Sequence, residues 1–538
     1  MGRGGHVRPY PVCPSETDNR SYLKVRPRMP DVFHRRAAMT ANPLQLTGHI
    51  AGAFVAPNGE EIPVIDPSTG RMVAVLHETS RDEVHRAVVA ARSAFERGPW
   101  GRATVAERQR ALMGIHDAIL DHAEELAELE TLNTGIPLAQ TANIHVARAA
   151  QNFRFFSEFI NQQEGDVYTQ ENGYMSLVTY DPIGVCALIG PWNMPLGLTA
   201  MKIAGALAFG NTCVVKPSEM TPLTLCRLFQ ILDERNILPE GVLNLVNGRG
   251  AVTGDALSSH PDIDMVSFTG GTETGARILS ALARGIKGGA MELGGKSASI
   301  VYDDCDLERA VDGAMLGSFM NNGQMCLAGS RLFVHRGIAD AFIEKFTERT
   351  RSLIVGDPFE RTTEVGPMIN TGQLERMEHY VASGLKESAT LLAGGRRHGG
   401  FDAGYYFEPT VMTAPGNDLA ICQEEIFAPF ATFQIFDEED EAISLANDSR
   451  FGLVGYVWTN NLERAMRNSA RLQTGTVLVN TPIMRDLRTG FGGVRQSGLG
   501  REGAKGSRAM FTEMKSTVIA LKPPALPKMG MTGAGENA

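Results

Sequence analysis

The sequence predicts an α/β protein with two parallel sheets, and three observations lead to this fold class. From residue 183 to about residue 292, short β-branched runs alternate with segments of helical periodicity, which is typical of successive β-α-β units. A second alternation of the same kind extends from about residue 297 to residue 480. The chain has 538 residues, 43% of them hydrophobic, which is enough for about three domains with large cores. We therefore expect a cleft between two α/β domains, with ligands beyond the carboxyl ends of the strands.

The two ends of the chain lack this alternation. Residues 1–45 are expected to be a disordered extension, because residues 1–44 combine eight Lys or Arg, three Asp or Glu and six prolines without periodicity. Residues 52–70 then have the short apolar runs and turn residues of a β-meander. Residues 523–538 are rich in proline and glycine and are expected to be a flexible tail.

Capping boxes predict two helices before the first sheet. Ser80 with Glu83 and Thr104 with Glu107 each precede apolar residues at helical spacing. A third helix is expected near residues 139–160. Residues 167–182 alternate and contain Asn-Gly, which predicts a hairpin that projects from the body. The expected strands and helices that follow are 184–189, 194–210, 211–216, 221–236, 242–248 and 264–270.

Composition excludes several classes of protein. The formal net charge is −10, which is the wrong sign for binding nucleic acid through its phosphates. The seven cysteines form no CxxC pair and no Cys/His cluster, so we expect no metal site and free thiols in a reducing, cytoplasmic environment. No secretory signal is visible, and prolines interrupt the best membrane candidate, Pro182 to Met201. We expect neither nucleic acid nor a membrane as a partner.

The ends of the predicted strands contain polar groups suited to ligand binding. Asn193 lies in a rigid Pro-Trp-Asn-Met-Pro turn, where its amide could donate to a developing oxyanion or could only cap the next helix. Lys216 and Glu219 follow the next strand and could bind ribose hydroxyls or form a solvated edge. Residues 266–275 form a glycine turn before a helix, which suits pyrophosphate although it is not a GxGxxG motif.

Later motifs offer a base and a nucleophile. Glu292 precedes a Gly-Gly pair where backbone can approach closely, and it could be a base or a surface acid. Cys326 lies among polar residues at an expected helix entry, where we expect a lowered thiol pKa, although a structural role stays open. Glu424 and Glu425 are adjacent and could be an acid/base pair or surface residues. The remaining thiols mostly lie in apolar strands or on a helix, which favours burial and inertness.

Eight fragments in this order resemble the signature blocks of the aldehyde dehydrogenase superfamily: PWNMP, KPSE, FTGGTETG, ELGGK, GQMCLAGSR, EEIFAPF, NDSRFGL and FGGVRQSGLGREG. The resemblance covers roughly residues 46–522. It implies a Rossmann-type NAD-binding domain, a catalytic α/β domain and a β-arm that completes a neighbour's sheet in a homodimer or homotetramer. The expected boundaries are 46–160 with 184–292 for the NAD-binding domain, 293–496 for the catalytic domain, and 161–183 with 497–522 for the arm.

The resemblance also implies roles for individual residues. Cys326 matches the nucleophile, Glu292 the general base, Asn193 the oxyanion donor and Lys202 a lysine of proton relay. Trp192 matches a residue that lies beside the substrate tunnel and the cofactor. The other positions expected to bind the cofactor are Ile189, Lys216, Ser218, Glu219, Gly250, Phe268, Gly270, Gly271, Leu293, Glu425 and Phe427.

The chemistry implied is oxidation of an aldehyde to a carboxylic acid. The Cys326 thiolate adds to the aldehyde, hydride transfer to NAD leaves a thioester, and water activated by Glu292 hydrolyses it. Glu219 would repel a 2′-phosphate, so NAD is expected rather than NADP. A CoA-acylating enzyme is the alternative, which the presence of Glu292 disfavours, and a silent binding protein is a further one, which the intact Cys326, Glu292 and Asn193 disfavour.

The substrate prediction rests on two arginines. Residues 147–159 and 480–493 resemble the branch of the family that oxidises 2-hydroxymuconate semialdehyde and its 5-carboxymethyl relative. The arginines that hold the substrate carboxylate in that branch match Arg148 and Arg485, and Arg488 is a rival for the second position. Guanidinium groups suit carboxylates because they pair with them bidentately. Betaine, aliphatic or aromatic aldehydes are the alternative substrates, and the arginines could instead only bridge structural elements.

Overall fold

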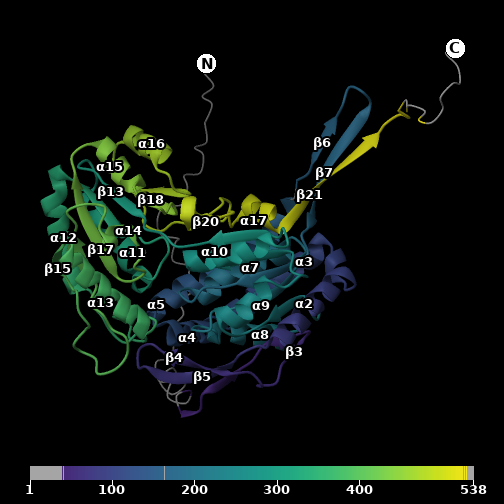
Figure 1. The fold of residues 1–538 in the computed structure, drawn as a ribbon, viewed down its shortest axis with the longest axis horizontal. Helices are drawn as coiled ribbons and strands as arrows, with labels where there is room; N and C mark the ends of the chain where they lie inside the picture. Colours follow the sequence, from purple (N-terminus) through teal and green to yellow (C-terminus); the bar gives the residue numbers. More distant parts are fainter. Residues whose placement is uncertain (1–38, 40, 163, 525, 527–528, 530–538) are drawn as a thin grey trace, which may run out of the picture.

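The computed structural model describes residues 39, 41–162, 164–524, 526 and 529. The predicted N-terminal extension, apart from residues 39 and 41–45, and most of the predicted tail therefore lie outside the described residues. Two large sheets with their helices lie beside one another, one built around β8 to β12 and the other around β13 to β18 (Figure 1). A three-stranded arm projects from the body at one end (Figure 1).

The first large sheet has eight strands in the order β20-β12-β11-β8-β9-β10-β2-β3. Its parallel part runs outward from β8 in both directions, through β9 to β10 on one side and through β11 to β12 on the other. The strand order therefore reverses beside β8, and such a point leaves a crevice at the carboxyl ends of the strands. The strands are β2 (His49–Ile50), β3 (Ala53–Phe54), β8 (Val185–Ile189), β9 (Thr212–Lys216), β10 (Leu243–Leu245), β11 (Met265–Thr269), β12 (Gly288–Glu292) and β20 (Gly498–Leu499).

Strand β8 shows why these segments are short, continuous apolar runs. Cys186 and Leu188 pack into one core cluster, and Val185, Ala187 and Ile189 pack into another. Both faces of the sheet are covered, so every position along the strand must be apolar. The helices of this part are α2 (Arg81–Glu96), α3 (Val105–Asp121), α4 (Ala123–Thr134), α5 (Leu138–Gln140), α6 (Ala147–Phe159), α7 (Pro195–Ala208), α8 (Leu223–Glu234), α9 (Asp255–Ser258) and α10 (Thr272–Ala283).

The predicted helix starts are confirmed. The side chains of Ser80 and Thr104 accept hydrogen bonds from the backbone N–H groups of Glu83 and Glu107, and both capping boxes are complete. The expected helix near 139–160 contains a π-helical stretch, η2 (Thr141–Val146), between α5 and α6. Ahead of these helices, β1 (Leu44–Leu46), β4 (Glu61–Asp66) and β5 (Arg71–His77) form a small separate sheet.

The second large sheet has seven strands in the order β15-β16-β17-β14-β13-β18-β19, all parallel except β15. These strands are β13 (Ala298–Val301), β14 (Arg331–His335), β15 (Thr390–Ala393), β16 (Thr410–Thr413), β17 (Phe430–Phe436), β18 (Val454–Trp458) and β19 (Thr476–Val479). The helices are α11 (Leu307–Phe319), α12 (Ala339–Ser352), α13 (Thr371–Lys386), α14 (Ala420–Gln423), α15 (Glu439–Asn447) and α16 (Leu462–Arg471).

The arm begins later in the chain than the sequence predicts. Its strands are β6 (Asp166–Thr169), β7 (Tyr174–Pro182) and β21 (Thr512–Ala520), and the hairpin between β6 and β7 turns at Gly173 with φ 87°. Residues 497–511 lie elsewhere, because β20 pairs with β12 and α17 (Ala504–Phe511) packs on α7. The predicted arm segment 497–522 was therefore too long. Within the described residues, no helix is both long and apolar enough to cross a bilayer.

Candidate active site

Cys326 lies in a turn between the 3-10 helix η5 (Met320–Gly323) and β14, so the expected helix entry was wrong. Asn321, Asn322 and Gly323 have φ values of 57°, 56° and 67°. Asparagine and glycine tolerate this left-handed region, which explains how the sequence forms so tight a loop. Burial raises the pKa of the Cys326 thiol to about 12, the opposite of the expected shift. The thiol therefore needs a base to become a nucleophile.

The other described thiols agree with the sequence-based expectation. Cys186 and Cys213 lie in strands and Cys226 on a helix, and all three are buried. Burial raises the pKa of Cys226 to about 12. Cys422 is buried and Cys305 is half-buried, whereas Cys13 lies outside the described residues.

Asn193 lies at the ligand-facing end of β8 and points toward the Cys326 loop. Its Nδ2 atom donates to the carbonyl of Gln324 at 2.8 Å. No side-chain hydrogen bond caps α7, so the alternative in which Asn193 only caps that helix is wrong. Asn193 as a whole residue is only 7% exposed.

Glu292 ends β12 and is surrounded by charged groups. Burial and the nearby Glu502 carboxylate raise its pKa well above the ordinary value, and Lys202 and Arg485 oppose this shift. The buried Nζ atom of Lys202 donates to Glu502 Oε1 at 2.7 Å and to Ser267 Oγ at 3.0 Å. Sequence reasoning missed Glu502, whose only signal was its place in the final GREG fragment.

The glycines after Glu292 allow the close approach that the sequence predicts. A Cβ atom on Gly294 would collide with the Glu425 carboxylate, and one on Gly295 would collide with the Cys326 carbonyl. The N–H group of Gly295 donates to Glu425 Oε1 at 3.0 Å. This segment therefore joins the end of β12 to both the Cys326 loop and Glu425.

Glu425 and Glu424 are separated by the fold, which disfavours an acid/base pair. Glu424 accepts a hydrogen bond from the Tyr380 hydroxyl at 2.6 Å. Burial raises the pKa of Glu425 to about 7. Phe427 adopts a φ of 60°, unusual for a bulky residue, and its ring packs edge-on against Trp192 at 5.1 Å. Glu425, Phe427 and Trp192 therefore approach the crevice from both domains.

Lys216 is the last residue of β9, and Glu219 lies in the segment that follows it. Lys216 Nζ donates to Glu219 Oε2 at 3.4 Å, and the N–H group of Gly250 donates to Glu219 Oε1 at 3.4 Å. Burial lowers the pKa of Lys216, and the Glu219 carboxylate opposes this shift. Ser218 accepts a hydrogen bond from the N–H group of Met220. These groups form a polar edge rather than a freely solvated one, because Lys216 and Ser218 are buried.

The remaining predicted cofactor positions lie around the same crevice. Gly271 precedes the first turn of α10, and a Cβ atom on Gly250 or Gly271 would meet no atom within 4 Å. Backbone is therefore open to a ligand at both glycines. A Cβ atom on Gly270 would collide with the ring of Phe268. Ile189 and Leu293 are buried at the ends of β8 and β12.

Arg148 and Arg485 are half-buried, whereas Arg488 is exposed. The Nε atoms of Arg148 and Arg485 have no hydrogen-bond partner among the described residues. Burial and the charge of Arg485 lower the pKa of Arg148 to about 9, and it also interacts with Glu502 and Cys326. Arg485 packs over the ring of Phe491 at 4.6 Å. Arg488 pairs with Asp486 at 2.6 Å in solvent, which removes it as the rival.

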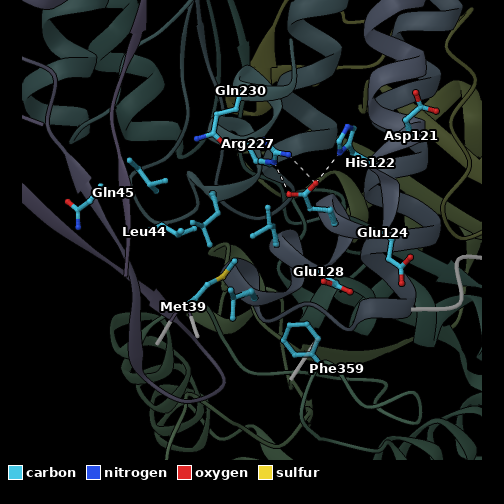
Figure 2. A pocket seen from close by; sticks show the side chains of 15 residues that line it. Met39, Leu44, Gln45, Asp121, His122, Glu124, Glu128, Arg227, Gln230 and Phe359 are labelled. Carbon is cyan, nitrogen blue, oxygen red and sulfur yellow. Dashed lines mark hydrogen bonds and ion pairs between the residues drawn. The ribbon is translucent and has the colours of Figure 1, made fainter. Parts of the chain in front are cut away.

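A separate cavity lies among α4, α8 and β1 and contains none of the predicted site residues. It has a volume of about 630 Å³, and Arg227 and His122 lie in its wall (Figure 2). Both side chains are hydrogen-bonded to Glu125. Part of the cavity wall is apolar and is formed by Leu44, Leu129 and Leu132. No cluster of His, Cys, Asp or Glu able to hold a metal ion occurs in the part of the chain that the structure describes.

Comparison with known proteins supports one family over nearly the whole chain. The model of the aldehyde dehydrogenase family matches residues 54–517. Aldehyde dehydrogenase family 2 member B4, mitochondrial, of Arabidopsis thaliana is 41% identical over 478 residues, covering 88% of each chain. The 2-hydroxymuconic semialdehyde dehydrogenase of Pseudomonas sp. strain CF600 is 39% identical, covering 88% of this chain and 99% of its own. The NAD⁺ complex of an aldehyde dehydrogenase from Bacillus cereus superposes with a TM-score of 0.87 at 36% identity, covering 93% of this chain and 100% of that one.

Proposed function

This chain belongs to the aldehyde dehydrogenase family, and we propose that, within this NAD-dependent activity, its substrate is a semialdehyde that also carries a carboxylate. The proposal assigns Cys326 as the nucleophile, Asn193 as the oxyanion donor and Glu292 as the general base. The observation that carries the substrate class is a pair of half-buried arginines with buried Nε atoms, Arg148 and Arg485, whose charges interact with Cys326.

The catalytic assignments follow from the local chemistry. The Cys326 thiol has a raised pKa, so it gives up its proton only to a base, and Glu292, whose pKa is also raised, interacts with it electrostatically. Asn193 keeps a second amide N–H for an oxyanion after its bond to Gln324. The Lys202–Glu502 ion pair beside Glu292 can pass a proton onward, because both groups are hydrogen-bonded. Ionisation of the thiol, stabilisation of the oxyanion and transfer of the proton therefore each have a suitable side chain.

The residues around the crevice fit NAD, which accepts hydride from the substrate. Lys216 and Glu219 would bind the adenosine ribose, and the open backbone at Gly271 would bind pyrophosphate at the start of α10. Glu425 would accept hydrogen bonds from the nicotinamide ribose. Phe427 and Trp192 form an apolar wall that excludes water there.

The charged side chains near Cys326 support a binding site for the substrate carboxylate. Arg148 and Arg485 place two positive groups near Cys326, and Glu502 interacts with both of them, whereas the pKa of Glu292 is raised. Buried cations are costly unless an anion pairs with them. The Nε atoms of both arginines have no hydrogen-bond partner among the described residues, and a substrate carboxylate would accept hydrogen bonds from them.

We expect Arg148→Ala and Arg485→Ala each to raise KM for 2-hydroxymuconate semialdehyde by about 10- to 100-fold, because each removes a charge-assisted hydrogen bond of about 1.5–3 kcal/mol. KM for a neutral aliphatic aldehyde such as hexanal should change by no more than about 3-fold. Initial rates of NADH formation, with and without CoA, measure both. Dependence on CoA would indicate the acylating alternative.

Arg488→Ala is the matched control, because Arg488 lies in the same loop but pairs with Asp486 in solvent. It should leave both KM values unchanged. Equal effects of Arg148→Ala on acidic and neutral aldehydes would reject the carboxylate site. They would favour an aldehyde without a carboxylate as the substrate.

Replacing Glu219 should shift the cofactor preference. The carboxylate lies where a 2′-phosphate would approach, and like charges in contact cost several kcal/mol. We expect Glu219→Ser to raise kcat/KM for NADP relative to NAD by about 10-fold or more. Glu463→Gln, on an exposed helix of the other domain, should leave the ratio unchanged. An unaltered ratio in Glu219→Ser would place the 2′-position elsewhere.

The arm also suggests how the chain assembles. Strand β21 pairs with β7 along its length, with Thr512 opposite Pro182 and Ala520 opposite Tyr174. Three apolar side chains are exposed on this arm, those of Val167, Met514 and Val518. A homodimer or homotetramer would cover them.

The cytoplasm is the proposed location, because a reducing environment keeps Cys326 as a thiol.

A further inference from the structure

A buried chain of hydrogen bonds connects the first domain to the loop before Cys326. His145 Nδ1 lies 3.1 Å from Glu130 Oε1, and His145 Nε2 lies 2.8 Å from Asn321 Oδ1. The three side chains come from α4, η2 and η5, and each is at least 96% buried. None of them belongs to the site predicted from the sequence.

Neighbouring groups fix the direction of the hydrogen bond between His145 and Asn321. Asn321 Nδ2 donates to the carbonyls of Asn193 at 3.0 Å and Gln324 at 3.1 Å, so its Oδ1 atom must accept from His145 Nε2. At the other end of the chain, Glu130 Oε1 lies within hydrogen-bond distance of His145 Nδ1 and also accepts from the N–H group of Leu196 at 3.2 Å.

The chain ends at the proposed oxyanion donor. Asn193 Nδ2 donates to the same Gln324 carbonyl that Asn321 binds. One N–H of the Asn193 amide is therefore held on an anchored acceptor, and its second N–H has a fixed direction. The Asn193 backbone is held as well, because its carbonyl accepts from Asn321.

We infer that Glu130, His145 and Asn321 are positioning residues that hold the Asn193 amide for the oxyanion formed on the substrate. The inference rests on the proposed roles of Asn193 and Cys326. An oxyanion donor is effective when its direction is set before the reaction, and a displacement of about 1 Å can cost about 100-fold in rate.

The loop offers a matched control next to Asn321. Asn322 has nearly the same φ, 56° against 57°, and is also buried. Its side chain binds the carbonyls of Gly135 and Pro367 and the N–H group of Gly366 instead. Glycine accepts the left-handed conformation at either position, so each side chain can be removed without backbone strain.

The test compares Asn321→Gly with Asn322→Gly in two reactions of Cys326. Acylation by 4-nitrophenyl acetate forms an oxyanion, whereas alkylation by iodoacetamide does not. We expect Asn321→Gly to slow acylation by about 10- to 100-fold and alkylation by less than about 3-fold. Asn322→Gly should change both by less than about 3-fold. In NADH assays, kcat should fall in Asn321→Gly while KM stays nearly constant.

A second pair of variants tests the histidine. His145→Gln keeps an N–H donor for Asn321, so its acylation rate should lie nearer to the wild type than that of His145→Leu. The inference is overturned if the two Gly variants slow acylation equally, if acylation in Asn321→Gly is unchanged, or if alkylation falls as much as acylation. Acylation needs neither NAD nor an aldehyde, so a wild type that acylates but forms no NADH would reject the proposed function and leave this test intact.

Discussion

Cys326→Ala should lower the rate of NADH formation by about four orders of magnitude or more, the largest effect expected of any single change in this chain. Removal of a covalent nucleophile leaves only binding and oxyanion stabilisation, which are far weaker alone. Initial rates of NADH formation with 2-hydroxymuconate semialdehyde measure the loss. NAD binding, followed by quenching of tryptophan fluorescence, should be retained because the crevice beyond β8 and β9 is unchanged.

Cys305→Ala is the control for this variant. Cys305 is half-buried between β13 and α11, and burial raises the pKa of its thiol to about 11. Its replacement should leave kcat within about 2-fold. If Cys326→Ala retained more than a few per cent of the wild-type rate, the nucleophile would have to be another group.

Glu292→Gln should separate the two halves of the reaction. The amide keeps the size of the carboxyl group but cannot accept a proton, so hydrolysis of the thioester loses its base. We expect steady-state kcat to fall by about 100- to 10,000-fold. If the thiol can still ionise through solvent, rapid mixing should show a burst of about one NADH per active site, which marks accumulation of the acyl enzyme.

The pH dependence of kcat tests the same assignment of Glu292 as the general base. Burial and Glu502 raise the pKa of Glu292, so the protonated, inactive form of this base persists to higher pH than in a free carboxyl group. In the wild type, kcat should therefore rise with pH until Glu292 is fully ionised. Glu292→Gln should lose this rise, and its persistence would assign the titration to another group.

Much of the fold could be predicted because its signals are local. The strands from Val185 to Thr269 are continuous apolar runs because helices cover both faces of their sheet. The helices that begin after Ser80 and Thr104 are set by a few neighbouring residues. The start of the second arm segment had no local signal in the sequence. Residues 498–499 pair with strand β12, which is distant in the sequence, and therefore do not belong to the arm.

The electrostatics of the site could not be predicted in the same way. The pKa of Cys326 depends on burial by segments far away in the sequence, so polar neighbours along the chain gave the wrong direction. Arg485 and Arg488 occupy one loop and differ only in their three-dimensional contacts: Arg485 packs over Phe491, whereas Arg488 is exposed and pairs with Asp486. Asn321 gave no signal, since its proposed role depends on contacts with two segments that are distant in the sequence, at His145 and Asn193.

The contact between the two places where the chain passes from one domain to the other has a mechanical consequence. Ser497 on the return crossing donates to the carbonyl of Gly294 at 2.7 Å, and its own carbonyl accepts from Leu293 at 2.9 Å on the outward crossing. Two crossings joined in this way would act as a single hinge in any rotation of the domains. Glu292, the proposed base, lies next to this hinge, where such a rotation would displace it least relative to Cys326.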